Sequence, residues 1–374
     1  MEIIARGRPL HARSLEVGVA EGEGGRWQAW AALLDLRKSG FVPVGGDLQS
    51  SGVIHHMRLA ARLDPRSRVL EEIRASQPTV AFEPSQLSRG ESCRDPAGNL
   101  EALRGTRLDA EHARRLNQAI GGPRGCSHVL TLARLLASTL ARALAVEAAA
   151  GGPGGRGRRP GERILHRSLA LDGLQPSPER LELAFQLCDL HFAPAPAVAR
   201  PMDRFAGDLA VRGLAEIEVA TLSLAGLRAG ERRRSLPDLE GAPWRDRSGD
   251  LAELVGQPLI GGMARRVLEL LGRDLESAPL LDALLHLAPA FQQCLATLSE
   301  QAAHEAVRDP TLVVSGGITD SCYMWRRDGA LASVRREERA EQGGDADFGA
   351  DAPGEARRRF VERSLARPRS GDVG

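Results

Sequence analysis

Residues 93–140 have the sequence CRDPAGNLEALRGTRLDAEHARRLNQAIGGPRGCSHVLTLARLLASTL, and residues 244–291 repeat it in part as WRDRSGDLAELVGQPLIGGMARRVLELLGRDLESAPLLDALLHLAPAF. At a constant offset of 151 residues, 14 of the 48 positions are identical without a gap. A composition this rich in Ala, Leu, Arg and Gly gives about four identities by chance. We therefore predict that the chain contains two copies of one unit. The shared positions are all Arg, Asp, Gly, Ala or Leu.

The second copy lacks the sulfur and imidazole groups of the first. The replaced residues are Cys93 (Trp244 in the second copy), Cys126 (Ser277) and His128 (Pro279). The shared positions therefore indicate the fold, and the lost ones indicate a function that only the first copy keeps. No motif in the chain indicates a particular reaction.

The composition is that of an ordinary globular protein, with 42% hydrophobic and 26% charged residues among 374. The formal charge is +1, and the arginines are interleaved with acidic residues. Such a surface has no single-sign field to attract nucleic acid or an acidic membrane. We therefore expect neither as a partner, and a small-molecule ligand is the partner class that stays open. The sequence does not determine the oligomeric state.

The cellular location is predicted from two stretches and the cysteine count. Residues 1–16 contain charged residues and no apolar core of signal-peptide length. The most apolar stretch, residues 129–150, is interrupted by Arg134, Arg142 and Glu147, which favours a helix packed on protein over a membrane span. Five widely spaced cysteines argue against a disulfide framework. We expect a cytoplasmic protein with free thiols.

The hydrophobic pattern predicts an α+β fold of two tandem units, each an antiparallel sheet followed by two helices on one face. In the first unit it predicts a strand at 27–37, a hairpin of 53–63 with 68–76, a helix at 109–120 and a second helix from 126 to about 150. In the second unit it predicts strands at 181–192 and 209–227 and helices at 262–271 and 280–305.

The domain boundaries follow from these elements. We predict a first unit at 1–150, a linker at 151–161 with the sequence GGPGGRGRRPG, and a degenerate second unit at 162–308. A returning β-hairpin is expected within 309–334, where 321–325 pairs with 330–334. Residues 335–374 have almost no large apolar side chains, which predicts a disordered tail.

Four segments are similar to a known bacterial family: Val53-Ile54-His55-His56-Met57, Cys93-Arg94-Asp95-Pro96, Gly121-Gly122-Pro123-Arg124-Gly125-Cys126-Ser127-His128-Val129-Leu130, and Ser321-Cys322 before Arg327-Asp328-Gly329. With these segments the first copy resembles the domain-of-unknown-function family 2889, and the second copy is a degenerate version. In simpler relatives, a segment like the one around Cys322 follows closely after the helix that begins at Gly125-Cys126. Here the second unit lies between the two, which suggests an insertion or duplication. The resemblance implies no established activity.

A metal site is the first functional hypothesis. Thiolate and imidazole groups suit zinc or iron, and a tetrahedral shell needs four ligands. The candidate ligands are Cys93, Cys126, His128, Cys322 and His55. An iron–sulfur cluster is a further alternative for three cysteines and a histidine. If Cys126 and Cys322 share one metal, their sulfurs should lie within about 4 Å of each other.

Two other hypotheses stay open. Cys126 at a helix start would be favoured as a thiolate, which makes it a candidate nucleophile with His128 or His55 as its base. Alternatively, the cysteines and histidines simply pack in a non-catalytic binding or scaffold module. Side-chain alternation on a strand lets only one of His55 and His56 face the helices. The sequence thus does not decide whether the protein is an enzyme.

Overall fold

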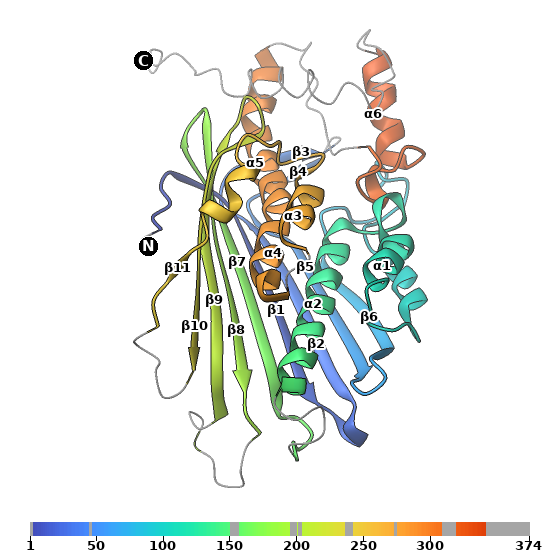
Figure 1. Cartoon of the computed structure of the whole chain (residues 1–374). Coiled ribbons are helices and arrows are strands. Elements are labelled where there is room, and N and C mark those ends of the chain that lie inside the picture. Colours follow the sequence, from blue (N-terminus) through green and yellow to red (C-terminus); the bar gives the residue numbers. More distant parts are fainter. Residues whose placement is uncertain are drawn as a thin grey trace.

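A computed structural model of the chain (Figure 1) describes residues 3–44, 47–149, 157–194, 200, 204–235, 242–272, 275–308 and 319–341. Its strands are β1 (Arg8–Glu21), β2 (Trp27–Arg37), β3 (Val42–Val44), β4 (Asp47–Gln49), β5 (Gly52–Asp64), β6 (Val69–Thr79), β7 (Arg163–Ser177), β8 (Arg180–Phe192), β9 (Phe205–Glu218), β10 (Ser223–Ser235) and β11 (Arg245–Asp246). Its α-helices are α1 (His112–Ile120), α2 (Ser127–Ala149), α3 (Met263–Leu271), α4 (Ala278–Leu285), α5 (Leu287–Arg308) and α6 (Ala330–Glu341). Short 3-10 helices include η2 (Asp95–Leu103), η3 (Gly122–Arg124), η5 (Gly249–Leu254) and η7 (Tyr323–Trp325).

Nine of the strands form one antiparallel sheet in the order β11-β10-β9-β8-β7-β1-β2-β5-β6. The predicted α+β class is confirmed, but the two expected units are not separate, because β1 pairs with β7 from Arg8 opposite Gln175 to Ala20 opposite Arg163. Residues 151–156 of the expected linker lie outside the described residues. We call β1, β2, β5, β6, α1 and α2 the first half, and β7 to β10 with α3, α4 and α5 the second half.

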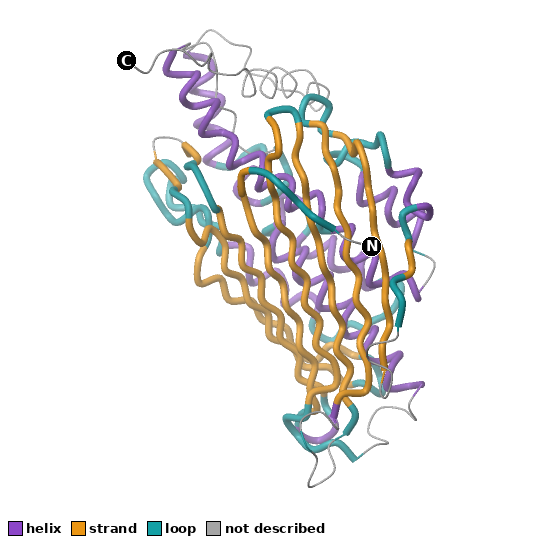
Figure 2. The backbone as a smooth tube through the Cα atoms, turned by 90° about the vertical axis from the view of Figure 1, so that its left-hand side faces the viewer, coloured by secondary structure: helices purple, strands orange, loops and turns teal. Residues whose placement is uncertain are grey.

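The helices that pack on the sheet cover one face, and the other face carries no helix among the described residues (Figures 1 and 2). Helix α2 packs on β1, β2, β5 and β7, whereas α5 packs on β1, β7 and β8. Alternate residues of each strand point to this covered face. Leu15 of β1, Leu33 of β2 and Met57 of β5 are therefore buried, in the same core cluster as Leu132 and Leu135 of α2.

The two strands at the centre of the sheet have no counterpart among the predicted elements. Strand β1 alternates inward His11, Arg13, Leu15, Val17 and Val19 with outward residues. Polar groups at the first two inward positions interrupt its apolar alternation. Strand β7 is the neighbour of β1 and likewise carries a buried arginine, at position 167. A charged side chain on a core-facing position obscures the pattern by which a half-buried strand is predicted.

Helix α2 has the length and apolar composition of a membrane-spanning segment. However, half of its most apolar window is buried inside the protein. This agrees with the expectation of a helix packed on protein. The predicted helix at 280–305 is divided into α4 and α5 at His286, whose ring Nδ1 bonds the carbonyl oxygen of Asp282 at 2.8 Å.

The expected hairpin within 309–334 and the expected disorder from 335 are both wrong where the structure describes them. Residues 323–325 form η7, and residues 330–341 form helix α6. A carboxylate oxygen of Glu91 accepts a hydrogen bond from the first backbone N–H of α6, at Ala330, at 3.1 Å. An acid at this position stabilises a helix start. Residues 309–318 and 342–374 lie outside the described residues.

A buried ion pair joins the end of α2 to the second half. Glu147 is 1% exposed and accepts hydrogen bonds from Arg158 at 2.7 Å and from His191, at the end of β8, at 3.4 Å. Burial by itself raises the pKa of Glu147, but His191 and Arg158 hold it at about 2. The carboxylate therefore stays ionised in the folded protein far below its ordinary pKa.

We expect Glu147→Gln to lower the free energy of unfolding by about 2–3 kcal/mol at pH 7. Because the pKa of Glu147 is lower in the folded than in the unfolded chain, its contribution is full above about pH 5 and disappears as the pH falls toward 2. Urea unfolding of both proteins across this range should show the difference shrinking. Glu111→Gln, at an exposed pair with Arg114, is the control and should change little. A difference that stays constant with pH would contradict this assignment.

Candidate functional site

The centre of the candidate site is a buried ion pair between β1 and β2. Arg13 and Asp35 lie opposite each other in the register and are 1% and 0% exposed. The Nε and Nη2 groups of Arg13 donate to Oδ1 and Oδ2 of Asp35 at 2.8 and 2.9 Å. Burial by itself raises the pKa of Asp35, but Arg13 and hydrogen bonds from two histidines hold it well below its ordinary value. Asp35 is therefore a carboxylate that can orient other groups.

Two histidines from the neighbouring strands bind this carboxylate. His11 of β1 contributes its Nε2 to Oδ1 of Asp35 at 2.9 Å. His55 of β5 lies opposite Asp35 and contributes its Nδ1 to Oδ2 at 3.2 Å. His55 points to the helices and is 4% exposed, whereas His56 points away from them and accepts a hydrogen bond from Arg58. The alternation of side chains along β5 therefore places His55, and not His56, in the site.

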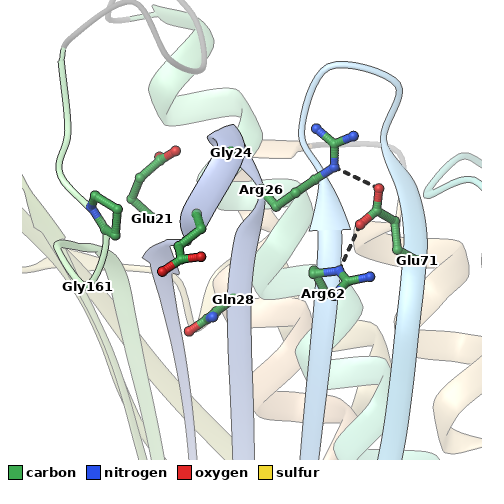
Figure 3. Close-up of a pocket in the computed structure, with 10 residues that line it drawn as sticks. Glu21, Gly24, Arg26, Gln28, Arg62, Glu71 and Gly161 are labelled. Atoms are coloured by element: carbon green, nitrogen blue, oxygen red, sulfur yellow. Dashed lines mark hydrogen bonds and ion pairs between the residues drawn. The ribbon is translucent and has the colours of Figure 1, made fainter.

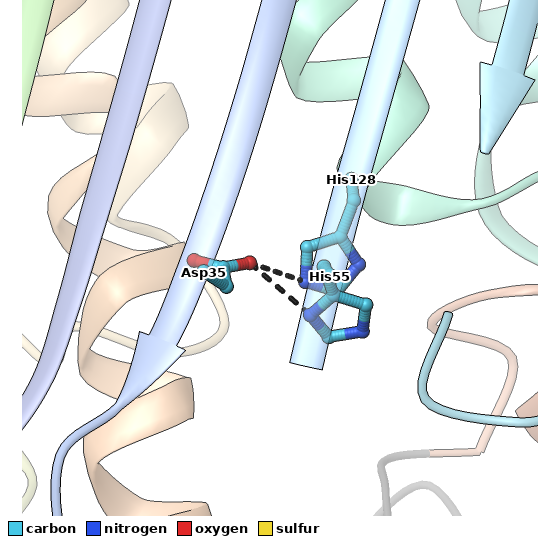
Figure 4. Close-up of side chains that lie close together, drawn as sticks. All are labelled: Asp35, His55 and His128. Carbon is cyan, nitrogen blue, oxygen red and sulfur yellow. Dashed lines mark hydrogen bonds and ion pairs between the residues drawn. The ribbon is translucent and has the colours of Figure 1, made fainter. Parts of the chain in front are cut away.

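The third histidine, His128, comes from the first turn of α2 (Figure 4). Its Nε2 lies 3.4 Å from Oδ2 of Asp35, and its ring stacks on that of His55 with centroids 3.7 Å apart. The side-chain amide of Gln293, on α5, lies 3.2 Å from the same Nε2. Helices of both halves therefore close the site over the sheet.

Asp35, His55 and His128 are the one group of at least three potential metal ligands within 4.8 Å of one another in the part of the chain that the structure describes. Burial lowers the pKa of His128 well below its ordinary value, and the neighbouring His55 lowers it further. A neutral imidazole is the form that binds a metal ion. The arrangement therefore has the chemistry of a two-histidine, one-carboxylate centre.

The three candidate cysteines are not part of this group, and Cys126 lies beside it. The Sγ atom of Cys126 is 3.9 Å from Nδ1 of His128, on the side of the ring away from Asp35. Burial raises the pKa of Cys126 to about 11 and that of Cys93 well above its ordinary value. Burial also raises the pKa of Cys322. All three are therefore protonated thiols at neutral pH in the protein without a ligand.

The segment that contains Cys322 returns to the first half. The backbone N–H of Tyr323 donates to the carbonyl of Gly125 at 2.9 Å, next to Cys126. Phe82 connects this segment to Cys93, since its carbonyl accepts the N–H of Cys93 at 3.2 Å and its ring packs edge-on against Trp325. The thiols of Cys93, Cys126 and Cys322 are close enough to raise one another's pKa.

The second half contains the same ion pair without the histidines. Arg167 and Asp189 lie opposite each other on β7 and β8, and Nε and Nη2 of Arg167 donate to Asp189 at 2.6 and 2.7 Å. The residue two positions before the arginine is Leu165 in place of His11, and the residue opposite the aspartate is Leu209 in place of His55. Both leucines are buried. The ion pair alone therefore does not require histidines around it.

Arginine side chains contact the residues that stand in place of Cys126 and Cys93 in the second half. Arg247 donates to the hydroxyl of Ser277 at 3.1 Å, and Ser277 stands at the position of Cys126 in the repeat. Arg212 lies 3.9 Å above the ring of Trp244, which stands at the position of Cys93. These positions therefore carry no group that resembles the thiols of the first half.

A pocket lies at the opposite end of the sheet, near the turn between β1 and β2 (Figure 3). Its two arginines, Arg26 and Arg62, are already paired with Glu71 at 2.7 and 2.8 Å. None of its described lining residues is a histidine or a cysteine. We therefore place the candidate site at the Asp35 cluster.

Four residues of the cluster are absent from the set of candidates drawn from the sequence: His11, Arg13, Asp35 and Gln293. Asp35 is one of the inward positions of β2, which run from Trp27 through Leu33 to Arg37. An aspartate at a core-facing position of a strand needs a buried partner. Side-chain alternation across β1 and β2 was the signal that could have identified Arg13 and Asp35 as that pair.

A comparison with known families supports the resemblance found in the sequence. Residues 11–142, about a third of the chain, match the family model of a protein of unknown function (DUF2889). This range contains His11, Arg13, Asp35, His55 and His128. It includes neither the second half nor the Cys322 segment. No curated protein and no solved structure matches the chain.

We expect Asp35→Asn to lower the free energy of unfolding by about 3–5 kcal/mol, because it leaves Arg13 buried without a counter-charge. Asp189→Asn is the matched control. Arg167 keeps a second carboxylate, that of Asp282, so the loss there should be smaller, about 1–3 kcal/mol. Urea unfolding followed by circular dichroism measures both. Equal losses, or a larger loss at position 189, would contradict the assigned role of Asp35.

Proposed function

We propose that the protein binds one divalent transition metal ion at Asp35, His55 and His128. The observation that carries this proposal is the gathering of three ligand atoms from β2, β5 and α2 within 4.8 Å of one another. The ion would take the place of the proton on Nδ1 of His55 and would bind Nε2 of His128 and Oδ2 of Asp35. Arg13 and His11 would hold the carboxylate from the other side.

The distances between the ligand atoms support this proposal. Metal–nitrogen and metal–oxygen bonds of 2.0–2.1 Å place two ligands of a tetrahedron about 3.3–3.4 Å apart. Oδ2 of Asp35 lies 3.2 Å from Nδ1 of His55 and 3.4 Å from Nε2 of His128. Cys126, on the Nδ1 side of His128, would orient that ring as an outer partner.

The ligand set favours zinc or ferrous iron and leaves a position open. Two imidazoles and one carboxylate are typical of both ions. Three protein ligands with a fourth position for water or substrate are typical of catalytic metal sites rather than structural ones. We therefore propose a metalloenzyme that acts on a small organic molecule. The side-chain amide of Gln293 lies 3.2 Å from Nε2 of His128 and would thus be close to the metal.

We further propose that the two halves derive from one unit and that only the first half kept its function. The 14 identities between residues 93–140 and 244–291 support this origin, as does the ion pair that recurs at Arg167 and Asp189. The second half has Leu165, Leu209 and Pro279 in place of His11, His55 and His128, which supports the loss of function in that half.

Elemental analysis of freshly purified protein tests the metal centre. We expect about one equivalent of zinc or iron, and less than a tenth of an equivalent in the His55→Gln and His128→Gln variants. His112→Gln is the matched control, because His112 is buried on α1 outside the cluster.

Two results would contradict this metal centre. The first is wild-type protein with less than a tenth of an equivalent of any transition metal. The second is a metal that is lost in Cys93→Ser and Cys126→Ser and kept in His55→Gln, which would indicate the cysteine ligand set instead. Visible absorption that disappears in the cysteine variants would indicate an iron–sulfur cluster.

A metal-free cysteine nucleophile is the second candidate function. One observation favours it: His128 contacts Sγ of Cys126 through Nδ1 at 3.9 Å and Asp35 through Nε2 at 3.4 Å. Covalent catalysis typically uses a nucleophile, a base beside it and a third group that orients the base. Cys126, His128 and Asp35 would take these three roles. Cys126 also directly precedes α2, where backbone N–H groups can stabilise a thiolate. Acyl transfer or carbon–carbon bond chemistry would suit such a thiol.

Alkylation with iodoacetamide at pH 6, followed by mass spectrometry, tests this second candidate. A nucleophilic Cys126 should react at least tenfold faster than Cys188 and Cys294, and His128→Gln should abolish the difference while His112→Gln keeps it. Equal rates at all three thiols would exclude the nucleophile. Failure of both the metal and the alkylation experiments would support the third hypothesis, a non-catalytic binding or scaffold module.

A further inference from the structure

Arg13 has an unused hydrogen-bond donor in the buried site. Its Nε and Nη2 groups bind Asp35, but its Nη1 group has no partner among the described residues. The side chain is 1% exposed. A buried charged donor that lacks an acceptor is costly, and in native proteins it indicates a bound water or ligand.

The second half contains the acceptor that Arg13 lacks. Nη1 of Arg167 donates to a carboxylate oxygen of Asp282, which also accepts a hydrogen bond from Ser138. Asp282 is the fifth residue of α4, and Thr131 is the fifth residue of α2. The hydroxyl of Thr131 donates to the carbonyl of His128 at 3.0 Å and offers Arg13 no carboxylate.

A second buried guanidinium adds to the positive charge of the first half. Arg37 lies two residues after Asp35 on β2, points to the same face and is 3% exposed. Its Nη1 donates to the backbone carbonyl of Gln49 at 2.7 Å, and its Nε has no partner among the described residues. Two buried arginines therefore accompany one buried carboxylate, that of Asp35, among the described residues at this end of β1 and β2. A bound anion would balance the excess charge.

We propose that the first half binds a small molecule through a carboxylate group, which accepts the hydrogen bond of Arg13 Nη1 as the carboxylate of Asp282 does for Arg167. This inference deepens the proposed function and rests on it for one point, that the ligand lies beside the metal centre. The recurring geometry favours a carboxylate over a phosphate, because a phosphate has additional charged oxygens that need further donors.

Thermal unfolding of metal-free protein in acetate tests the proposal, with chloride and phosphate as comparison salts at the same ionic strength. We expect acetate at ten times its Kd to raise the Tm by about 2 °C. Thr131→Asp supplies the missing carboxylate within the chain, so it should raise the Tm in chloride and abolish the acetate effect. Thr131→Asn is the uncharged control and should keep that effect.

A second variant tests the same idea without relying on Thr131→Asp to fold. Asp282→Ala removes the carboxylate that Arg167 binds in the second half. We expect this variant to have a lower Tm in chloride and to recover at least half of the loss in acetate. Asp250→Ala, at an exposed acid paired with Arg247, is the control and should show no such recovery.

The proposal is overturned if acetate and phosphate stabilise the wild type equally, if Thr131→Asp keeps the acetate effect, or if acetate fails to rescue Asp282→Ala. Because these measurements use metal-free protein, their outcome is separate from the metal analysis. An acetate effect in protein that binds no metal would overturn the metal centre alone. Metal binding without an acetate effect would overturn the carboxylate site alone.

Discussion

The whole candidate site depends on the ion pair between Arg13 and Asp35. A carboxylate that is 0% exposed can stay ionised only if a cation and hydrogen-bond donors compensate for lost hydration. Arg13 supplies two of these donors from the neighbouring strand. The ionised Asp35 then determines how the rings of His11 and His55 are oriented and presents an oxygen to His128. The register between β1 and β2 therefore organises groups from four elements.

Elements with strong local signals could be predicted from the sequence. The strand at 27–37 and the hairpin that closes at Asp64 follow from alternation and turn residues, and α2 follows from its long apolar run after Gly125. The internal comparison also singled out His128, which lies in the cluster, whereas Pro279 at the matching position does not. Such features depend on residues close together in the chain.

The parts that could not be predicted depend on pairing across long sequence distances. Strands β1 and β7 join residues about 150 positions apart, and no local pattern indicates which strand edge meets which. The pairing of Arg13 with Asp35 is different, because the two residues lie only 22 positions apart on neighbouring strands and side-chain alternation could have indicated it. Helix α6 is stabilised at its start by Glu91, a residue 239 positions earlier. The returning segment therefore has a helix where its own residues indicated a strand.

The seam between β1 and β7 also constrains how the chain can fold during synthesis. When the ribosome has produced only the first half, β1 pairs with β2 but has no partner on the side where β7 will lie. Such unpaired edge strands tend to pair with other chains. Its partner begins at Arg163, only 14 residues after α2 ends at Ala149. A tether of this length keeps β7 at an effective concentration of about millimolar, well above that of competing nascent chains. Joining the halves in one polypeptide therefore protects the strand that carries Arg13 from aggregation.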